Sequence, residues 1–142
     1  MEASITLKKV GKLVRDKTIL ASLTFGIERG SIVAIIGDNE AGKSMLLKVI
    51  SGIEYQEYGQ VFINGIDNQK RRMEVMSSIG FVPHEIDLDP WLTVEQNILL
   101  GFNKIKLPNI EKLIEDIGLT SKKKQLAKDL SFGESQRVAI AR

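Results

Sequence analysis

A chain of 142 residues is long enough for one domain with a buried core, and its 43% hydrophobic and 27% charged residues are ordinary for a soluble globular protein. A net charge of +2 gives no reason to expect a nucleic-acid partner, and we interpret the run Lys122–Lys124 as a solvated helix face rather than a binding patch. The absence of cysteine excludes a disulfide framework and a Cys-ligated zinc site. With no signal-peptide pattern and no apolar run of about 20 residues, we expect a cytoplasmic protein that reaches a membrane only through a partner.

The first half of the chain is expected to contain five strands, because its apolar residues alternate with polar ones or form short β-branched runs. The strands are predicted at residues 5–7, 23–27, 31–36, 60–63 and 79–82, with a short helix at 70–77. The run at 31–36 is typical of a strand buried on both faces. Asn64-Gly65 is a strong turn signal, and Pro83 ends the last strand.

A glycine-containing loop follows the predicted strand at 31–36. Its sequence, Gly37-Asp38-Asn39-Glu40-Ala41-Gly42-Lys43-Ser44, fits the phosphate-binding pattern G-x-x-x-x-G-K-[ST], and an apolar helix pattern comes next. The glycines let backbone N–H groups approach phosphate, Lys43 is expected to reach the β- and γ-phosphates, and Ser44 is expected to ligate Mg²⁺. A turn that merely begins a helix is disfavoured, because strand, spacing, lysine and serine all agree. The predicted nucleotide-binding residues are Gly37, Asp38, Asn39, Glu40, Ala41, Gly42, Lys43, Ser44 and Met45.

The second half, from about Asp87, is predicted to be helical. Thr93 and Gln96 form a capping-box pattern, residues 110–117 carry an amphipathic stripe after Pro108, and a final helix begins at Ser131. We expect one domain over 1–142, divided into a β-rich nucleotide-binding core (1–86), a helical subdomain (87–130) and the last helix (131–142).

Three motifs, in order, resemble those of the ATP-binding cassette (ABC) ATPases. Residues 130–142, Leu-Ser-Phe-Gly-Glu-Ser-Gln-Arg-Val-Ala-Ile-Ala-Arg, resemble that family's signature L-S-G-G-Q-x-Q-R-V-x-I-A-R. Residues 92–98 resemble its L-T-V-x-E-N-L segment, and Gly80–His84 stand where its glutamine loop has G-y-x-P-Q. The resemblance covers essentially the whole chain. It implies an α/β fold, a P-loop NTPase core of the ABC type with an antiparallel β subdomain and a small helical subdomain.

The resemblance also implies partners and cofactors. In that family two cassettes pair head to tail, and the signature of one subunit closes over the γ-phosphate bound by the other. The positions implied to act in this way are Leu130, Ser131, Phe132, Gly133 and Glu134, with Ser131 and Gly133 contacting phosphate. Ser131 and Glu134 also fit a simple capping box, and both interpretations can hold together. ATP, Mg²⁺, a second nucleotide-binding subunit and a membrane permease are implied, with a location peripheral to the inner face of the cell membrane.

Several positions depart from the family pattern. Val14 falls near the place of an aromatic residue that stacks on adenine, which weakens base stacking. His84 replaces the glutamine thought to touch Mg²⁺ and the attacking water, so it is either a catalytic-site residue or a hinge. Glu40 adds negative charge beside the phosphate site, and Phe132 must turn its side chain away from phosphate. Trp91 either packs in the helical subdomain or lines a partner groove, and we favour packing.

The family's Mg²⁺-binding acid and catalytic glutamate belong to a strand that follows the signature helix. Since the sequence stops at Arg142, we expect the C-terminal part of the core to be missing, with no complete catalytic set. This predicts little ATP hydrolysis and an unpaired apolar edge at 31–36. The first hypothesis is therefore the ATP-binding subunit of an ABC transporter, which powers transport by hydrolysis in its intact form. The alternative is a non-catalytic nucleotide-binding module or half of a split ATPase.

Overall fold

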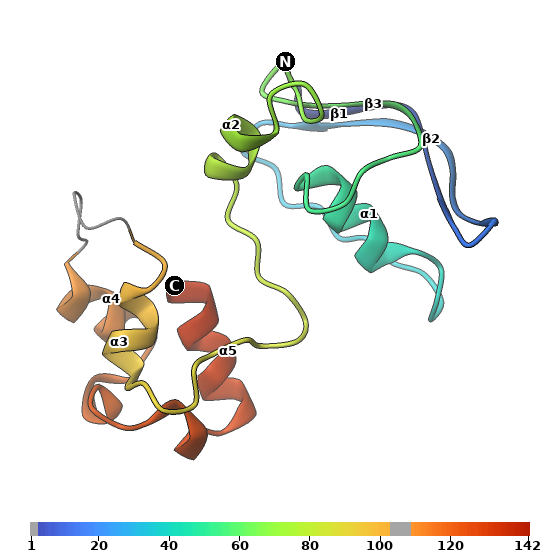
Figure 1. Cartoon of the computed structure of the whole chain (residues 1–142). Coiled ribbons are helices and arrows are strands. Elements are labelled where there is room, and N and C mark those ends of the chain that lie inside the picture. Colours follow the sequence, from blue (N-terminus) through green and yellow to red (C-terminus); the bar gives the residue numbers. More distant parts are fainter. Residues whose placement is uncertain (1–2, 103–108) are drawn as a thin grey trace. The chain divides into compact units, whose positions relative to one another are not determined.

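A computed structural model describes residues 3–102 and 109–142. The chain divides into two compact units, Met1–Phe81 and Val82–Arg142 (Figure 1). Each unit has its own hydrophobic core. None of the helices in the described ranges has the length and apolar character needed to cross a membrane. The boundary between these units lies between Phe81 and Val82 in the chain. The subdivision expected after residue 86 stays a prediction.

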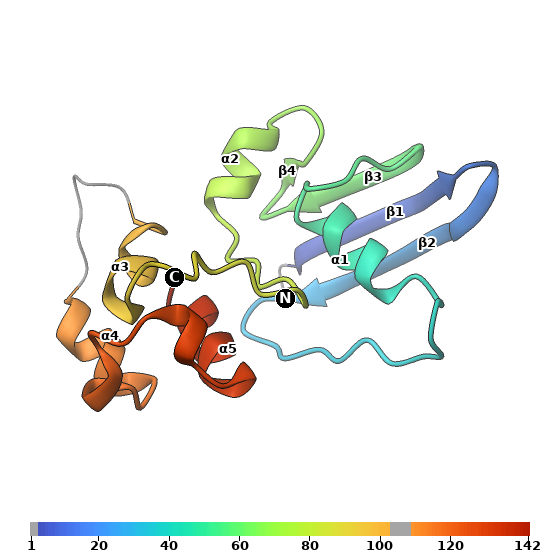
Figure 2. The same cartoon turned by 60° about the horizontal axis from the view of Figure 1, so that its bottom comes forward.

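The first unit is built on a four-stranded antiparallel sheet in the order β2-β1-β3-β4 (Figure 2). Its strands are β1 (Ala3–Val14), β2 (Lys17–Glu28), β3 (Tyr58–Ile63) and β4 (Ile66–Asp67). The β1–β2 hairpin turns through Arg15 and Asp16, both at positive φ, which suits the right-handed twist of the strands. Asn64 and Gly65, also at positive φ, make the β3–β4 turn. The strands predicted at 5–7, 23–27 and 60–63 and the Asn64-Gly65 turn are thus confirmed.

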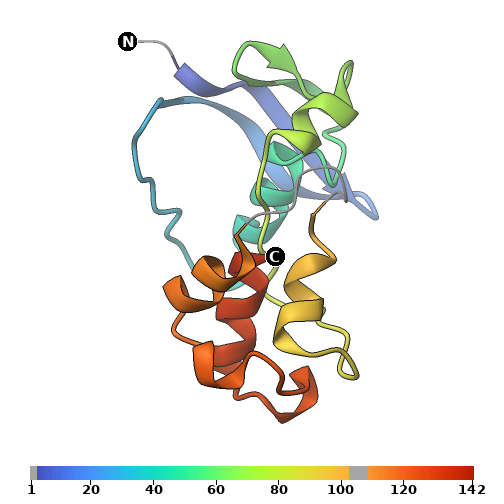
Figure 3. The same ribbon diagram turned by 90° about the vertical axis from the view of Figure 1, so that its left-hand side faces the viewer.

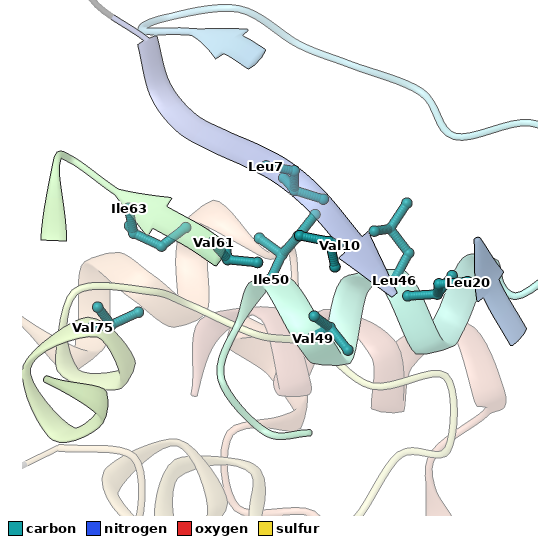
Figure 4. Close-up of a cluster of buried hydrophobic side chains, with 9 residues drawn as sticks. All are labelled: Leu7, Val10, Leu20, Leu46, Val49, Ile50, Val61, Ile63 and Val75. Atoms are coloured by element: carbon teal, nitrogen blue, oxygen red, sulfur yellow. The ribbon is translucent and has the colours of Figure 1, made fainter. Parts of the chain in front are cut away.

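Two helices accompany this sheet, α1 (Lys43–Ile50) and α2 (Arg72–Ser77), the second confirming the helix predicted at 70–77. Side chains from the sheet meet those of α1 in a continuous apolar cluster (Figure 4). Its buried members are Leu7, Val10, Leu20, Leu46, Val49, Ile50, Val61, Ile63 and Val75, and none is more than 7% exposed. Full burial of one such side chain stabilises the fold by about 1.5–3 kcal/mol. The cluster therefore fixes α1, and the loop before it, against the strands.

The strands predicted at 31–36 and 79–82 are wrong, because neither segment is hydrogen-bonded as a strand in the described structure. Ile32 and Ile36 are fully or almost fully exposed, at 102% and 91%, while Ile35 packs against the core of the first unit. A β-branched run favours extended backbone, but a strand also needs a neighbour for its N–H and C=O groups. The apolar sheet edge expected at 31–36 presupposed that strand, so it is not formed, and only the exposure of Ile32 and Ile36 agrees with it.

The second unit is helical, with α3 (Val94–Leu99), α4 (Ile110–Asp116), α5 (Phe132–Ala141) and two 3₁₀ turns, η1 (Thr120–Lys122) and η2 (Ala127–Asp129) (Figure 3). Its core contains Val94, Ile98, Ile114, Leu119 and Val138, each at most 2% exposed. The Thr93–Gln96 capping box forms as predicted. Pro108, expected before α4, lies outside the described residues.

Candidate functional site

The glycine-containing loop leads directly into α1, whose N-terminus has no side-chain cap. Gly42 is the N-cap residue, in the left-handed region at φ 90°, and it carries no side chain that could accept from the first turn. Within the described residues, the N–H groups of Lys43 and Ser44 have no hydrogen-bond acceptor. The helix start therefore offers free donors and the positive end of its dipole to an anion.

Lys43 closes the loop. Its Nζ donates hydrogen bonds to the carbonyl oxygens of Gly37, at 2.8 Å, and Asp38, at 2.6 Å. The side chain thus bridges the two ends of the loop. Backbone donors, helix dipole and ammonium all favour negative charge, so the residues fit a phosphate chain.

Gly42 lies directly on β2. A Cβ at this position would lie 2.9 Å from the carbonyl oxygen of Ile19 and 3.2 Å from side-chain carbons of Ile19 and Leu20. The loop therefore approaches the strand more closely than any other residue would allow. Glu40 also has a positive φ, 67°, and its side chain is exposed.

The two residues after Lys43 have different environments. Ser44 is exposed on the first turn of α1, where its hydroxyl is an oxygen ligand of the kind that Mg²⁺ takes together with phosphate oxygens. Met45 packs against the core, so only its backbone can serve a ligand. Among the residues that the structure describes, no group of three or more His, Cys, Asp and Glu side chains could hold a metal ion.

The signature segment forms the N-terminus of α5 in the second unit. Ser131 caps the helix, since its Oγ accepts from the Glu134 N–H at 3.4 Å, and the Ser131 N–H donates to Glu134 Oε2 at 3.0 Å. The capping box is therefore confirmed. Phe132 is 63% exposed, and the space around Gly133 is open. Leu130 packs against the core of the second unit and fixes the entry into the helix.

Two of the three lysines at 122–124, expected to form a solvated face, are only partly exposed, at 37% for Lys122 and 24% for Lys123, and both form ion pairs. Lys122 Nζ donates to Glu134 Oε1 at 2.7 Å, and this hydrogen bond is the main reason that the pKa of Glu134 lies below its usual value. Lys123 pairs with Glu111 and with Glu95, which raises the pKa of Lys123. Both lysines thus join the 3₁₀ turn η1 and the residue after it to neighbouring helices.

The remaining predicted residues fall in both units. Val14 ends β1 and is 40% exposed in the first unit, which also contains the phosphate loop. His84 is exposed and belongs to the second unit, with the signature segment, and its role stays a prediction. Trp91 is 69% exposed, with the Lys128 ammonium 4.3 Å from its ring centroid, so the packing that we favoured is wrong.

Asn97 is a residue whose role the sequence reasoning missed. It is fully buried, its Oδ1 accepts from the Asp89 N–H, and its Nδ2 donates to the carbonyls of Asp89, Leu92 and Thr93. The side chain thus fixes the segment that precedes α3. The sequence feature that could have predicted this role is its position three residues after Val94, which places a polar residue on the buried face of the helix.

Comparisons with known proteins agree with this geometry. The family model described as ABC transporter matches residues 20–142. The aliphatic sulfonates import ATP-binding protein SsuB of Bacillus subtilis (strain 168) is 39% identical over 132 residues, which cover 90% of this chain and 50% of that protein. The sulfate/thiosulfate import ATP-binding protein CysA of Gloeobacter violaceus is 35% identical over 145 residues, covering 98% of this chain and 42% of that protein.

Solved structures give the same result. The structure of cbiO1 from Clostridium perfringens, part of the ABC transporter complex cbiONQ, superposes with a TM-score of 0.83 at 27% identity. That match covers 99% of this chain and 61% of the other. The ATP-bound structure of a bacterial Atm1-family ABC exporter superposes with a TM-score of 0.87 at 27% identity, covering 98% of this chain and 27% of the other.

The chain spans about half the length of the curated relatives that it matches, between 42% and 53% for those of Gloeobacter, Bacillus subtilis and Bacillus cereus (strain ATCC 10987 / NRS 248). Within that span the match includes both the phosphate loop and the signature segment, and the P-loop fold is that of its structural neighbours. The chain belongs to the ABC transporter family.

Proposed function

We propose that this chain binds ATP through Gly37–Met45 and acts as a nucleotide-binding subunit of an ABC transporter. The observation that carries the proposal is the closed loop at the uncapped start of α1, where Lys43 Nζ donates hydrogen bonds to the carbonyl oxygens of Gly37 and Asp38. An arriving phosphate chain meets an ammonium and free N–H groups whose positions are already fixed, so little ordering remains to be done on binding.

Different residues of the loop would bind the phosphates and the metal ion. Lys43 and the first N–H groups of α1 hold the phosphates, and the Ser44 hydroxyl binds Mg²⁺ with phosphate oxygens. When bound, the ion would supply positive charge that neutralises the phosphates. Val14 gives the base an aliphatic contact at the end of β1.

Two partners follow from the family. We propose that Ser131 and Gly133 contact the γ-phosphate bound by a second nucleotide-binding subunit in a head-to-tail dimer. The second partner is a membrane permease, which would hold the chain at the inner face of the membrane. Support comes from the named sequence relatives, which are import ATP-binding proteins, and from cbiO1, which is part of a transporter complex. These relatives favour an import system.

Half of a split ATPase is the second candidate function. It is favoured by the exposure of Ile32 and Ile36, which lie immediately before the phosphate loop in a segment without strand hydrogen bonds, because such a segment suits pairing with a strand supplied by another chain.

Calorimetric titration of the purified chain with ATP and Mg²⁺ tests the main proposal. We expect one binding site per chain, with affinity reduced by tenfold or more in Lys43→Ala, since a charged hydrogen bond contributes about 1.5–3 kcal/mol. Lys48→Ala is the matched control, because Lys48 is exposed on the last turn of the same helix. Equal ATP affinity in the two variants would contradict the proposal.

A further inference from the structure

The signature segment contains a charge that opposes its proposed partner. Glu134 lies in the first turn of α5, where a carboxylate stabilises the helix through its dipole. A polyphosphate that approaches the same helix end is repelled by that carboxylate. The proposed trans contact therefore needs something that neutralises Glu134.

Lys122 occupies the required place. It comes from η1, twelve residues earlier in the chain, and its Nζ lies 2.7 Å from Glu134 Oε1. The Glu134 side chain is only 17% exposed and the Lys122 side chain 37% exposed, so solvent screens this pair less than a fully exposed one. The neighbouring Lys123 cannot neutralise Glu134 in its place, since Lys123 is paired with Glu95 and Glu111.

The same carboxylate also orients Ser131. Glu134 Oε2 accepts from the Ser131 N–H, and the Glu134 N–H donates to Ser131 Oγ. With one Oγ lone pair engaged in this way, the hydroxyl proton remains available to donate. In the part of the chain that the structure describes, the N–H groups of Phe132 and Gly133 have no acceptor. Three donors thus surround the helix start when Glu134 holds this position.

We propose that Lys122 is a positioning residue for the signature segment. It neutralises Glu134 and fixes it in the capping box, so that Ser131, Phe132 and Gly133 can present their donors to a polyphosphate. The inference rests on the proposed trans role of the signature. It adds a residue outside the motif, and it predicts that Lys122 is required only while residue 134 is charged. The lowered pKa of Glu134, caused mainly by Lys122, agrees with a carboxylate that stays ionised beside its partner.

Amide NMR of the 142-residue chain tests this role at the helix itself. Tripolyphosphate is titrated at neutral pH and low salt into a Lys43→Ala parent, which removes the strongest phosphate ligand of the first unit. The amide shifts of Phe132 and Gly133 then report binding at α5. We expect Lys122→Met to weaken that binding by roughly twofold to fivefold, the range for an exposed or half-exposed charge near a helix end. Lys122→Arg should retain it.

Removal of the opposing charge separates electrostatic positioning from a purely structural salt bridge. Glutamine at position 134 can still form the capping box without charge. We therefore expect Glu134→Gln to bind tripolyphosphate at least as tightly as the parent, and the Lys122→Met/Glu134→Gln double variant to return to the parent affinity. A structural salt bridge instead predicts that both single variants weaken binding alike.

Three results would overturn the inference. These are unchanged binding in Lys122→Met, a loss in Glu134→Gln as large as that in Lys122→Met, or no shift of the Phe132 and Gly133 amides in the parent. An unchanged spectrum elsewhere shows that each variant is folded. Calorimetric ATP binding by the chain with Lys43 intact is measured separately, so the inference can fail while the proposed nucleotide site stands.

Discussion

At the residue scale, the phosphate loop depends on one glycine more than on the other. Gly42 is held at φ 90° against the backbone of β2, whereas a Cβ on Gly37 would meet only Ala41 Cβ, at an ordinary 3.5 Å. Both glycines belong to the same motif, and the sequence pattern treats them as equivalent. The structure assigns them different roles, close approach at Gly42 and ordinary turn geometry at Gly37.

We expect Gly42→Ala to lower the free energy of unfolding by about 1–3 kcal/mol, because it combines a strained φ with a steric clash against Ile19. Gly37→Ala should change it by about 0.5 kcal/mol or less. Urea denaturation of both variants, followed by circular dichroism, measures the difference. Equal destabilisation would show that the close contact between Gly42 and β2 is not tight in solution.

The roles of single residues are easier to predict from a short sequence motif than when they depend on contacts between distant segments. The motif predicted Lys43 and Ser44, because the roles proposed for them depend on spacing within eight residues. Nothing local indicated that Lys122 would reach Glu134, twelve residues later, or that Asn97 would fix the backbone of Asp89. Such contacts depend on how separate elements pack, which the composition of a short window does not contain.

At the element scale, helix starts were predicted well and buried strands were not. Both capping boxes form, because a cap is completed within four residues. Residues 31–36 have a strand-like pattern but no hydrogen-bonded neighbour in the described structure, since a strand is completed only by another segment. Local elements are therefore more predictable than those that need a distant partner.

The α5 cap should give the chain a pH dependence of known sign. The folded state lowers the pKa of Glu134 below its ordinary value of 4.5, first through Lys122 and then through the Ser131 N–H. The contribution of Glu134 to stability is therefore fully present above pH 4.5, and it is lost as the pH falls through the lower folded value.

Thermal unfolding of the chain and of Glu134→Gln between pH 7 and pH 3 measures this contribution. We expect the wild-type chain to be the more stable at pH 7 and the difference to shrink below about pH 4.5. Glu115→Gln is the control, since Glu115 is exposed on α4 and belongs to none of the ion pairs found among the described residues. A difference that is independent of pH would contradict the assignment.

At the scale of the whole molecule, the chain presents an apolar segment immediately before its proposed nucleotide site. Ile32 and Ile36 are exposed at 102% and 91%, while Ile35 packs against the core. Exposed apolar side chains on a segment without strand hydrogen bonds favour association between chains.

We expect the Ile32→Lys/Ile36→Lys variant to reduce concentration-dependent self-association, as measured by light scattering, with little change in thermal stability. Ile35→Lys should instead destabilise the first unit, because it removes a side chain that packs on the core. If the double variant associates as strongly as the unaltered chain, this segment is not the contact surface.

The family relationship and the phosphate loop lead to one central claim, that Gly37–Met45 holds the phosphates of ATP. The most direct measurement is an amide NMR titration of the 142-residue chain with ATP and Mg²⁺. We expect the largest shifts on the loop and the first turn of α1, above all on Gly42, Lys43 and Ser44, and we expect them to disappear in Lys43→Ala. ATP-induced shifts that leave these amides unchanged, or that persist in Lys43→Ala, would contradict it.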